Sequence, residues 1–122
     1  MLELSTLSKT WIFDVDGTIV KHNGYLIDGH DTLLEGVAEF FDRLPKDDKI
    51  ILLTARKEEY LESLKDFLAS NKIRYDYLLT NMPMGERILV NDIKPSGLKT
   101  AYAINVGRDK NFSIDYELKE CL

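Results

Sequence analysis

The chain has 122 residues, of which 44% are apolar and 30% are charged, a balance typical of one globular domain over residues 1–122. Its 16 basic and 21 acidic residues give a net charge of −5, which argues weakly against nucleic acid as a partner. No apolar stretch has bilayer length, the pattern MLELSTLSKT does not predict secretion, and the one cysteine, Cys121, has no internal partner. We therefore expect a cytoplasmic protein without a membrane partner.

Apolar patterns predict alternating strands and helices along the first half of the chain. Residues 10–15, TWIFDV, are rich in β-branched and aromatic side chains and predict a buried strand. Residues 16–31 contain turn-forming glycine, asparagine and aspartate, so we expect an irregular flap there. A helix is predicted over residues 32–44, because Thr32 and Glu35 form a capping-box pattern and Pro45 follows the apolar run.

The second half of the chain continues this alternation. A helix is predicted from about residue 57 to residue 70, where apolar residues recur at helical spacing. The predicted strands are residues 50–53, 75–80, 88–90 and 101–106. The polar tail from residue 107 has no predicted structure. This order predicts an α/β fold with a Rossmann-like, mostly parallel five-stranded sheet.

Polar residues follow three of the predicted strands. Asp14 ends the first strand, Thr54 follows the second, and Asn91 and Asp92 follow the strand at 88–90. The carboxyl ends of parallel strands meet at one edge of a sheet, so we expect these groups to lie together. Two acids spaced like those of DVD point to the same side, and their hard oxygen atoms favour Mg²⁺. Taken alone, the spacing of acids in DVDGT is more typical of a solvated strand-to-turn exit.

Three segments together resemble one known family. WIFDVDGTIV, ILLTAR and ILVND are similar, in order and spacing, to the first, second and fourth motifs of the haloacid dehalogenase (HAD) superfamily of phosphohydrolases, over roughly residues 10–106. The resemblance implies an aspartyl-phosphate mechanism, with Asp14 as the nucleophile and Asp16 as general acid and then general base. It also implies that Mg²⁺ binds the Asp14 carboxylate, the Asp16 carbonyl oxygen and Asp92.

The same resemblance implies which groups hold the phosphate. The Thr54 hydroxyl and nearby backbone N–H groups would contact the phosphoryl oxygens. Arg56 would clamp a second anionic group of the substrate or, as the default interpretation, pair with Glu59 on the following helix. The residues expected to bind substrate are Gly17, Thr18, Ala55, Arg56 and Asn91.

The third motif of the family, a Lys or Arg after the third strand, has no obvious counterpart. The connection at residues 80–86, TNMPMGE, contains no basic residue. Arg87 and Lys94 are the candidates for this cation. We favour Lys94 slightly, because it lies two residues beyond Asp92, at the edge of the sheet where the site is expected.

The motifs leave no room for a cap domain, so only a short flap covers the predicted site. This small format is similar to that of phosphatases from bacterial surface-polysaccharide and sugar-phosphate pathways. The resemblance implies that capless members either act on bulky substrates or close the site with a neighbouring subunit. We therefore expect a magnesium-dependent phosphatase for a sugar phosphate or related phosphomonoester, as a homodimer or homotetramer. Two alternatives remain: a catalytically weak phosphate-binding or regulatory module, and an enzyme similar to polynucleotide 3′-phosphatases, which the acidic charge balance disfavours.

Overall fold

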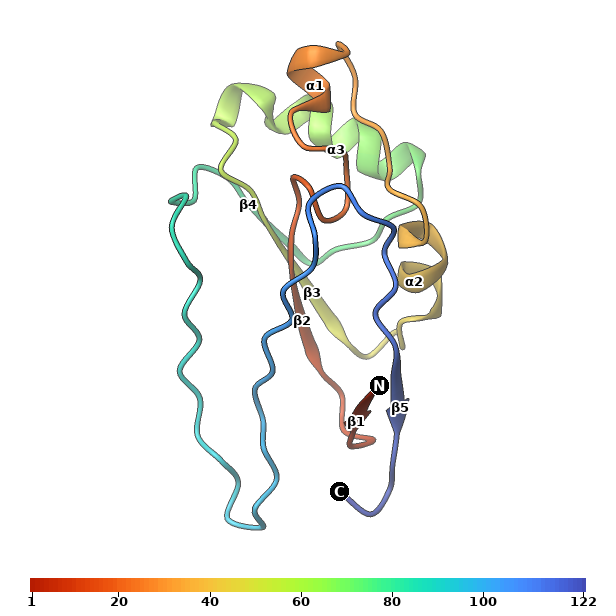
Figure 1. The fold of residues 1–122 in the computed structure, drawn as a ribbon, viewed down its shortest axis with the longest axis vertical. Coiled ribbons are helices and arrows are strands. Elements are labelled where there is room, and N and C mark those ends of the chain that lie inside the picture. The colour runs from red at the N-terminus through yellow and green to blue at the C-terminus, as the bar shows by residue number, and fades with distance from the viewer.

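The computed structural model describes residues 1–122 as a mixed α/β protein, consistent with the predicted Rossmann-like class (Figure 1). Its main sheet has three parallel strands in the order β2-β3-β4, namely β2 (Thr10–Asp14), β3 (Lys49–Leu53) and β4 (Tyr77–Leu79). The register pairs Asp14 at the end of β2 with Leu53 at the end of β3. The residues that follow these strands therefore emerge at the same edge of the sheet, as predicted.

The core lies between this sheet and two helices, α2 (Val37–Arg43) and α3 (Leu61–Ser70). Side chains alternate along a strand, so Ile50 and Leu52 of β3 point to the same face, and both are fully buried. They form one apolar cluster with residues of both helices and of the turn after β2. The cluster consists of Phe13, Val15, Ile19, Val20, Val37, Phe40, Phe41, Leu44, Ile50, Leu52, Leu64, Leu68, Ile73 and Phe112.

The helices differ from prediction mainly at their starts. The α2 helix begins after Gly36, which has φ +92°, and not at Thr32, so the predicted capping box is not formed. Leu33 instead bridges to Val20, which keeps this part of the chain extended. The predicted helix at 57–70 is confirmed as a short 3₁₀ turn, η1 (Glu58–Tyr60), followed by α3. None of the helices combines the length and apolar character needed to cross a membrane.

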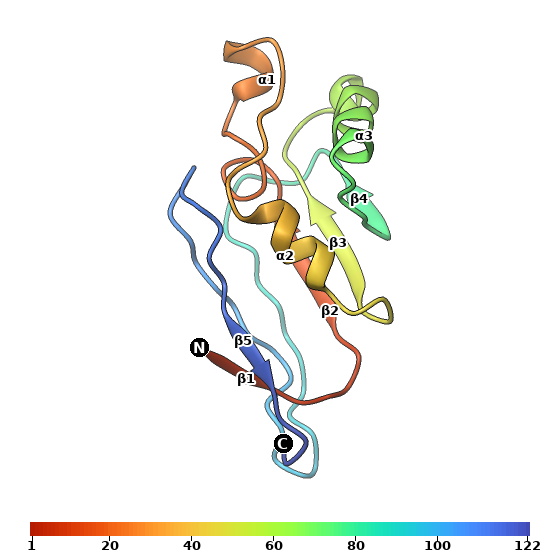
Figure 2. The ribbon, with the colours of Figure 1, turned by 90° about the vertical axis from the view of Figure 1, so that its right-hand side faces the viewer.

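The predicted strands at 88–90 and 101–106 are not formed, so the predicted five-stranded sheet is wrong. Residues 82–106 instead run past the sheet without regular structure, turn at residues 94–98, and return toward the carboxyl ends of the strands (Figures 1 and 2). We call this part of the chain the excursion. Most of its apolar residues are open to solvent, with Ile88 at 85% and Val90 at 89% exposure.

One edge of β2 consequently has no partner. β2 pairs only with β3, and Ile12 on β2 is 49% exposed. Parallel strands need a crossover of about a dozen residues or more between them. The connection after β4, residues 80–86, is shorter than that, which is a physical reason why the apolar run at 88–90 is not drawn into the sheet.

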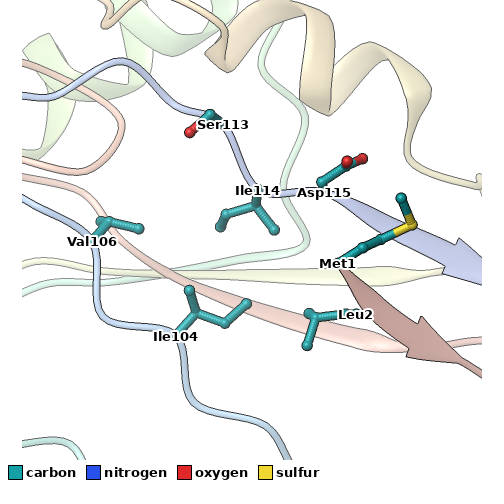
Figure 3. A pocket seen from close by; sticks show the side chains of 7 residues that line it. All are labelled: Met1, Leu2, Ile104, Val106, Ser113, Ile114 and Asp115. Carbon is teal, nitrogen blue, oxygen red and sulfur yellow. The ribbon is translucent and has the colours of Figure 1, made fainter.

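The two ends of the chain form a small second sheet that the sequence did not predict. β1 (Leu2–Leu4) pairs in parallel with β5 (Tyr116–Leu118). The tail reaches the core through Phe112, which is buried against Phe40 with ring centroids 4.9 Å apart. An apolar cavity of about 380 Å³ remains between β1, the tail and the returning limb of the excursion (Figure 3). None of its lining residues belongs to the predicted site.

Candidate functional site

The turn after β2 carries the first predicted motif. Gly17 has φ +87°, a backbone conformation that glycine adopts readily, and its N–H donates to the Val20 carbonyl oxygen at 2.7 Å. The Thr18 N–H donates to the Val15 carbonyl oxygen at 3.3 Å. These two N–H groups are therefore occupied within the turn. The backbone N–H groups of Asp16 and Ala55 make no hydrogen bond in the structure, so they are the free donors at this edge.

Asp14 is the most accessible acid of this turn, with its side chain 41% exposed. Its carboxylate accepts a hydrogen bond from the Thr18 hydroxyl at 3.3 Å and lies 3.5 Å from Nη1 of Arg87. Partial burial raises the pKa of the Asp14 carboxyl above its ordinary value, although the Arg87 cation and the Thr18 hydrogen bond act in the opposite direction.

Arg87, and not Lys94, is the cation beside Asp14. Lys94 lies in the turn of the excursion, where its backbone N–H donates to the Leu98 carbonyl oxygen. The preference for Lys94 therefore finds no support in the structure. Arg87 follows β4, whose carboxyl end lies at the same edge of the parallel sheet as that of β2, and its side chain reaches Asp14.

Asp16 is held on both of its carboxylate oxygens. Oδ2 accepts a hydrogen bond from the Thr54 hydroxyl at 2.7 Å. Oδ1 accepts from Nε and Nη2 of Arg56, at 3.0 and 2.8 Å. This set of donors fixes the direction of the Asp16 side chain. Asp16 and Thr54 therefore meet at this edge of the sheet.

Arg56 links Asp16 to the flap. Its side chain is 1% exposed and donates two hydrogen bonds to Asp31, at 3.0 and 2.6 Å. Its guanidinium also lies 3.7 Å from the centre of the Tyr25 ring. Burial opposes its charge, but the hydrogen bonds with Asp31 and Asp16 outweigh burial and raise the pKa of Arg56.

The predicted alternatives for Arg56 did not include these partners. Arg56 pairs with two carboxylates and not with Glu59, and four of the five N–H donors of its guanidinium are engaged. To clamp a substrate anion with two hydrogen bonds, it would have to release Asp31 or Asp16. Asp31 and Tyr25 were missed because they lie in the flap, whose path over the site no local sequence pattern specifies. The flap also contains a short helix, α1 (Gly24–Ile27), where only irregular structure was expected.

The structure does not complete the predicted metal site. No group of three or more His, Cys, Asp or Glu side chains lies in position to hold a metal ion. Asp92 lies in the excursion, where its carbonyl oxygen accepts a hydrogen bond from Thr100, and Asn91 donates to the same hydroxyl at 2.7 Å. The Asp14 carboxylate and the Asp16 carbonyl oxygen, which accepts no hydrogen bond, are the two predicted ligands present at the edge.

The polar tail contributes residues that the sequence did not identify. The Asp109 N–H donates to the Gly17 carbonyl oxygen at 2.9 Å, and the Asp109 carboxylate accepts from the His22 N–H at 2.7 Å. These bonds place Arg108 directly over Gly17. A Cβ atom built on Gly17 would lie 3.1 Å from Cγ of Arg108. The pairing joins residues far apart in the chain, so no spacing rule reveals it.

Comparison with known proteins gives a likeness to two solved chains. No family model and no curated protein matches this chain. It is similar to a chain in the structure of the Pnkp1/Rnl/Hen1 complex, with 32% identity and a TM-score of 0.52, over 68% of this chain and 31% of that one. It is also similar to a chain in the structure of the Pnkp1/Rnl/Hen1 RNA repair complex, with 33% identity and a TM-score of 0.53, over 69% of this chain and 29% of that one. The chain thus spans about a third of the length of the solved chains that it matches.

Proposed function

We propose that this chain is a phosphatase-like domain that removes a terminal phosphate from a nucleic acid strand, with Asp14 as the nucleophile. One observation carries the proposal: the half-exposed Asp14 carboxylate lies at the carboxyl edge of a parallel sheet, 3.5 Å from the Arg87 cation. The fixed Asp16–Thr54 pair lies on the same turn and the neighbouring strand end. Ligands bind at this edge in open α/β sheets.

The choice of nucleic acid rests on the comparisons and on local charge. The solved neighbours belong to an RNA repair complex, which favours the polynucleotide alternative over a sugar phosphate and lends no support to a surface-polysaccharide role. The expectation that nucleic acid is not a partner therefore gives way. Although the chain carries a net charge of −5, Arg87 and Arg108 both lie beside the turn after β2, so this edge has cations where a phosphate would bind.

The chemistry follows from the placement of the acids. An Asp14 oxygen bonds to phosphorus as the ester P–O bond breaks, and the electron pair leaves with the hydroxyl oxygen of the strand, which takes up a proton. Water then attacks the phosphoryl group, inorganic phosphate leaves, and the Asp14 carboxylate is restored. Arg87 faces the charge that develops on the phosphoryl oxygens.

Asp16 is best placed for the second of these steps. Held by Thr54 and Arg56, its carboxylate accepts a proton from the attacking water. The general-acid role implied by the HAD resemblance requires that Asp16 first take up a proton. It would then lose a hydrogen bond from Arg56 or Thr54.

Magnesium dependence belongs to the same proposal. A divalent ion at Asp14 would reduce the repulsion between the carboxylate and a phosphate. The Asp14 carboxylate and the Asp16 carbonyl oxygen fit such an ion, but Asp92 does not reach them, so we derive no step through it. The unpaired edge of β2 and the exposed apolar run at residues 88–90 are compatible with a closer approach of Asp92. The homodimer or homotetramer remains a prediction.

The test is phosphate release from a 3′-phosphorylated oligonucleotide, a 5′-phosphorylated one and p-nitrophenyl phosphate, each with and without Mg²⁺. We expect release from at least one oligonucleotide, loss of release in Asp14→Asn, and full release in the matched control Asp66→Asn, an exposed carboxyl on α3. Binding without any release would favour the phosphate-binding module. An active Asp14→Asn enzyme would contradict the covalent mechanism.

A further inference from the structure

We propose that Arg108 and His22 form a second anion subsite beside Asp14, which binds the backbone phosphate adjacent to the terminal phosphate of a nucleic acid strand. The proposal rests on the function proposed above and extends it, because it names a feature of the substrate that is distant from the reacting phosphorus. No sequence motif assigns a role to either residue.

The position of Arg108 is fixed by its neighbours. Residues 107–110 form a turn that lies against the turn after β2, at the carboxyl end of the sheet (Figure 1). Asp109 holds the two turns together, through its N–H to Gly17 at 2.9 Å and its carboxylate to the His22 N–H at 2.7 Å. The Arg108 side chain therefore begins over the same turn that carries Asp14.

Arg108 differs from the other two arginines at this edge. Arg56 is paired with two carboxylates, and Arg87 lies 3.5 Å from Asp14. Arg108 is exposed and makes neither an ion pair nor a hydrogen bond in the structure, although the chain has 21 acidic residues. The nearest acid in sequence, Asp109, directs its carboxylate to the His22 backbone. A guanidinium free in this way can bind a phosphate with two parallel hydrogen bonds.

His22 supplies the second observation. Its Nδ1 atom is buried and has no hydrogen-bond partner. Buried polar atoms are rarely left without a partner, so this ring nitrogen is an unused hydrogen-bonding group. A Cβ atom built on Gly17 would lie 3.7 Å from both Nε of Arg108 and Cβ of His22, so the two side chains flank the same glycine. Nδ1 donates to a phosphate oxygen when it carries the proton.

Two phosphates in sequence fit this arrangement better than one. A terminal phosphate at Asp14 would lie beside Arg87, and Arg108 and His22, which flank Gly17 on the same turn, would be left for the next backbone phosphate. A nucleoside 3′-phosphate and p-nitrophenyl phosphate carry one phosphate and leave the second subsite empty. A nucleoside 3′,5′-bisphosphate carries two and imitates the end of a strand.

The kinetic test compares these substrates in Arg108→Ala. We expect KM for the 3′-phosphorylated oligonucleotide and for the nucleoside 3′,5′-bisphosphate to rise about 10-fold, with kcat unchanged. KM for nucleoside 3′-phosphate should stay within about 2-fold of the unmutated value. This substrate has no second phosphate, so it has no contact with Arg108 to lose. The matched control is Arg43→Ala, which removes an exposed arginine at the end of α2. It should leave KM unchanged for all of these substrates.

A binding test needs no turnover. The binding of a fluorescent 3′-phosphorylated oligonucleotide is measured with Asp14→Asn protein and with the Asp14→Asn, Arg108→Ala double variant. The second change should weaken binding about 10-fold. It should also reduce the slope of log affinity against log salt concentration by about one, as expected for one lost phosphate contact. Arg108→Lys, which keeps the charge but not the planar fork, should recover part of the affinity. His22→Ala should also weaken binding of the oligonucleotide.

The outcomes separate the subsite from the enzyme. An equal loss on all substrates, or no loss on any, would overturn the subsite while the phosphatase stands. An effect on the bisphosphate but not on the oligonucleotide would overturn the nucleic acid assignment in favour of a small bisphosphate. Absence of phosphate release from every substrate, with Arg108-dependent binding retained, would reject the phosphatase and leave the subsite.

Discussion

Two regions of the protein contain short apolar runs flanked by polar residues: the body, residues 10–79, and the excursion, residues 82–106. Only the body forms a sheet. In the body, residues 15–48 and 54–76 connect the strands, and each connection contains a helix that covers the core. In the excursion, residues 80–86 are too few for such a crossover. An apolar run forms a strand when its connection can bring it beside a neighbour, and composition alone does not decide this.

The largest difference between these regions should appear on truncating their apolar side chains. Leu52 is fully buried in β3, so Leu52→Ala should lower the free energy of unfolding by about 4 kcal/mol through lost packing and a residual cavity. Val90 is 89% exposed, so Val90→Ala should change it by less than about 0.5 kcal/mol. Urea denaturation, monitored by circular dichroism, measures the free energy of unfolding of both variants. A large loss in Val90→Ala would show that residues 88–90 are packed in solution.

A second comparison concerns charge inside the body. Arg56→Ala leaves Asp16 and Asp31 as unpaired acids, the latter 4% exposed, and should lower the free energy of unfolding by about 3 kcal/mol. Lys57→Ala, at the exposed neighbouring position, is the control and should be nearly neutral. Urea denaturation measures the free energy of unfolding of both variants. Equal effects of the two changes would mean that Arg56 does not pair with Asp16 and Asp31.

A smaller effect is expected at Asp14, with a defined pH dependence. Because burial raises the pKa of this carboxyl in the folded protein, its ionisation costs stability once the pH exceeds the ordinary value near 3.8. Asp14→Asn should therefore raise Tm by about 1–2 °C at pH 7, a small change because the side chain is partly solvated. The difference should vanish near pH 3, where the acid is neutral in both states. Scanning calorimetry at both pH values measures this difference. A lower Tm for Asp14→Asn than for the unmutated protein at pH 7 would contradict the prediction.

The sequence located the part of the site that parallel register creates. Asp14, Asp16 and Thr54 follow adjacent strands in register, so their meeting at one edge follows from β-sheet geometry. Asp31 and Arg108 reach the same place through the flap and the tail, whose paths depend on contacts distant in sequence. For the same reason the pairing of β1 with β5 was not predicted, whereas the helix at 61–70 was, from its local periodicity.

The most direct test of the account is to look for phosphate on Asp14 itself. A reaction with a 3′-phosphorylated oligonucleotide is quenched with acid within a few turnovers, and the protein is digested and analysed by mass spectrometry. We predict a phosphoryl group on the peptide that contains Asp14, absent in Asp14→Asn, which also releases no phosphate. Phosphate release without a phosphorylated Asp14, or release undiminished in Asp14→Asn, would contradict the account.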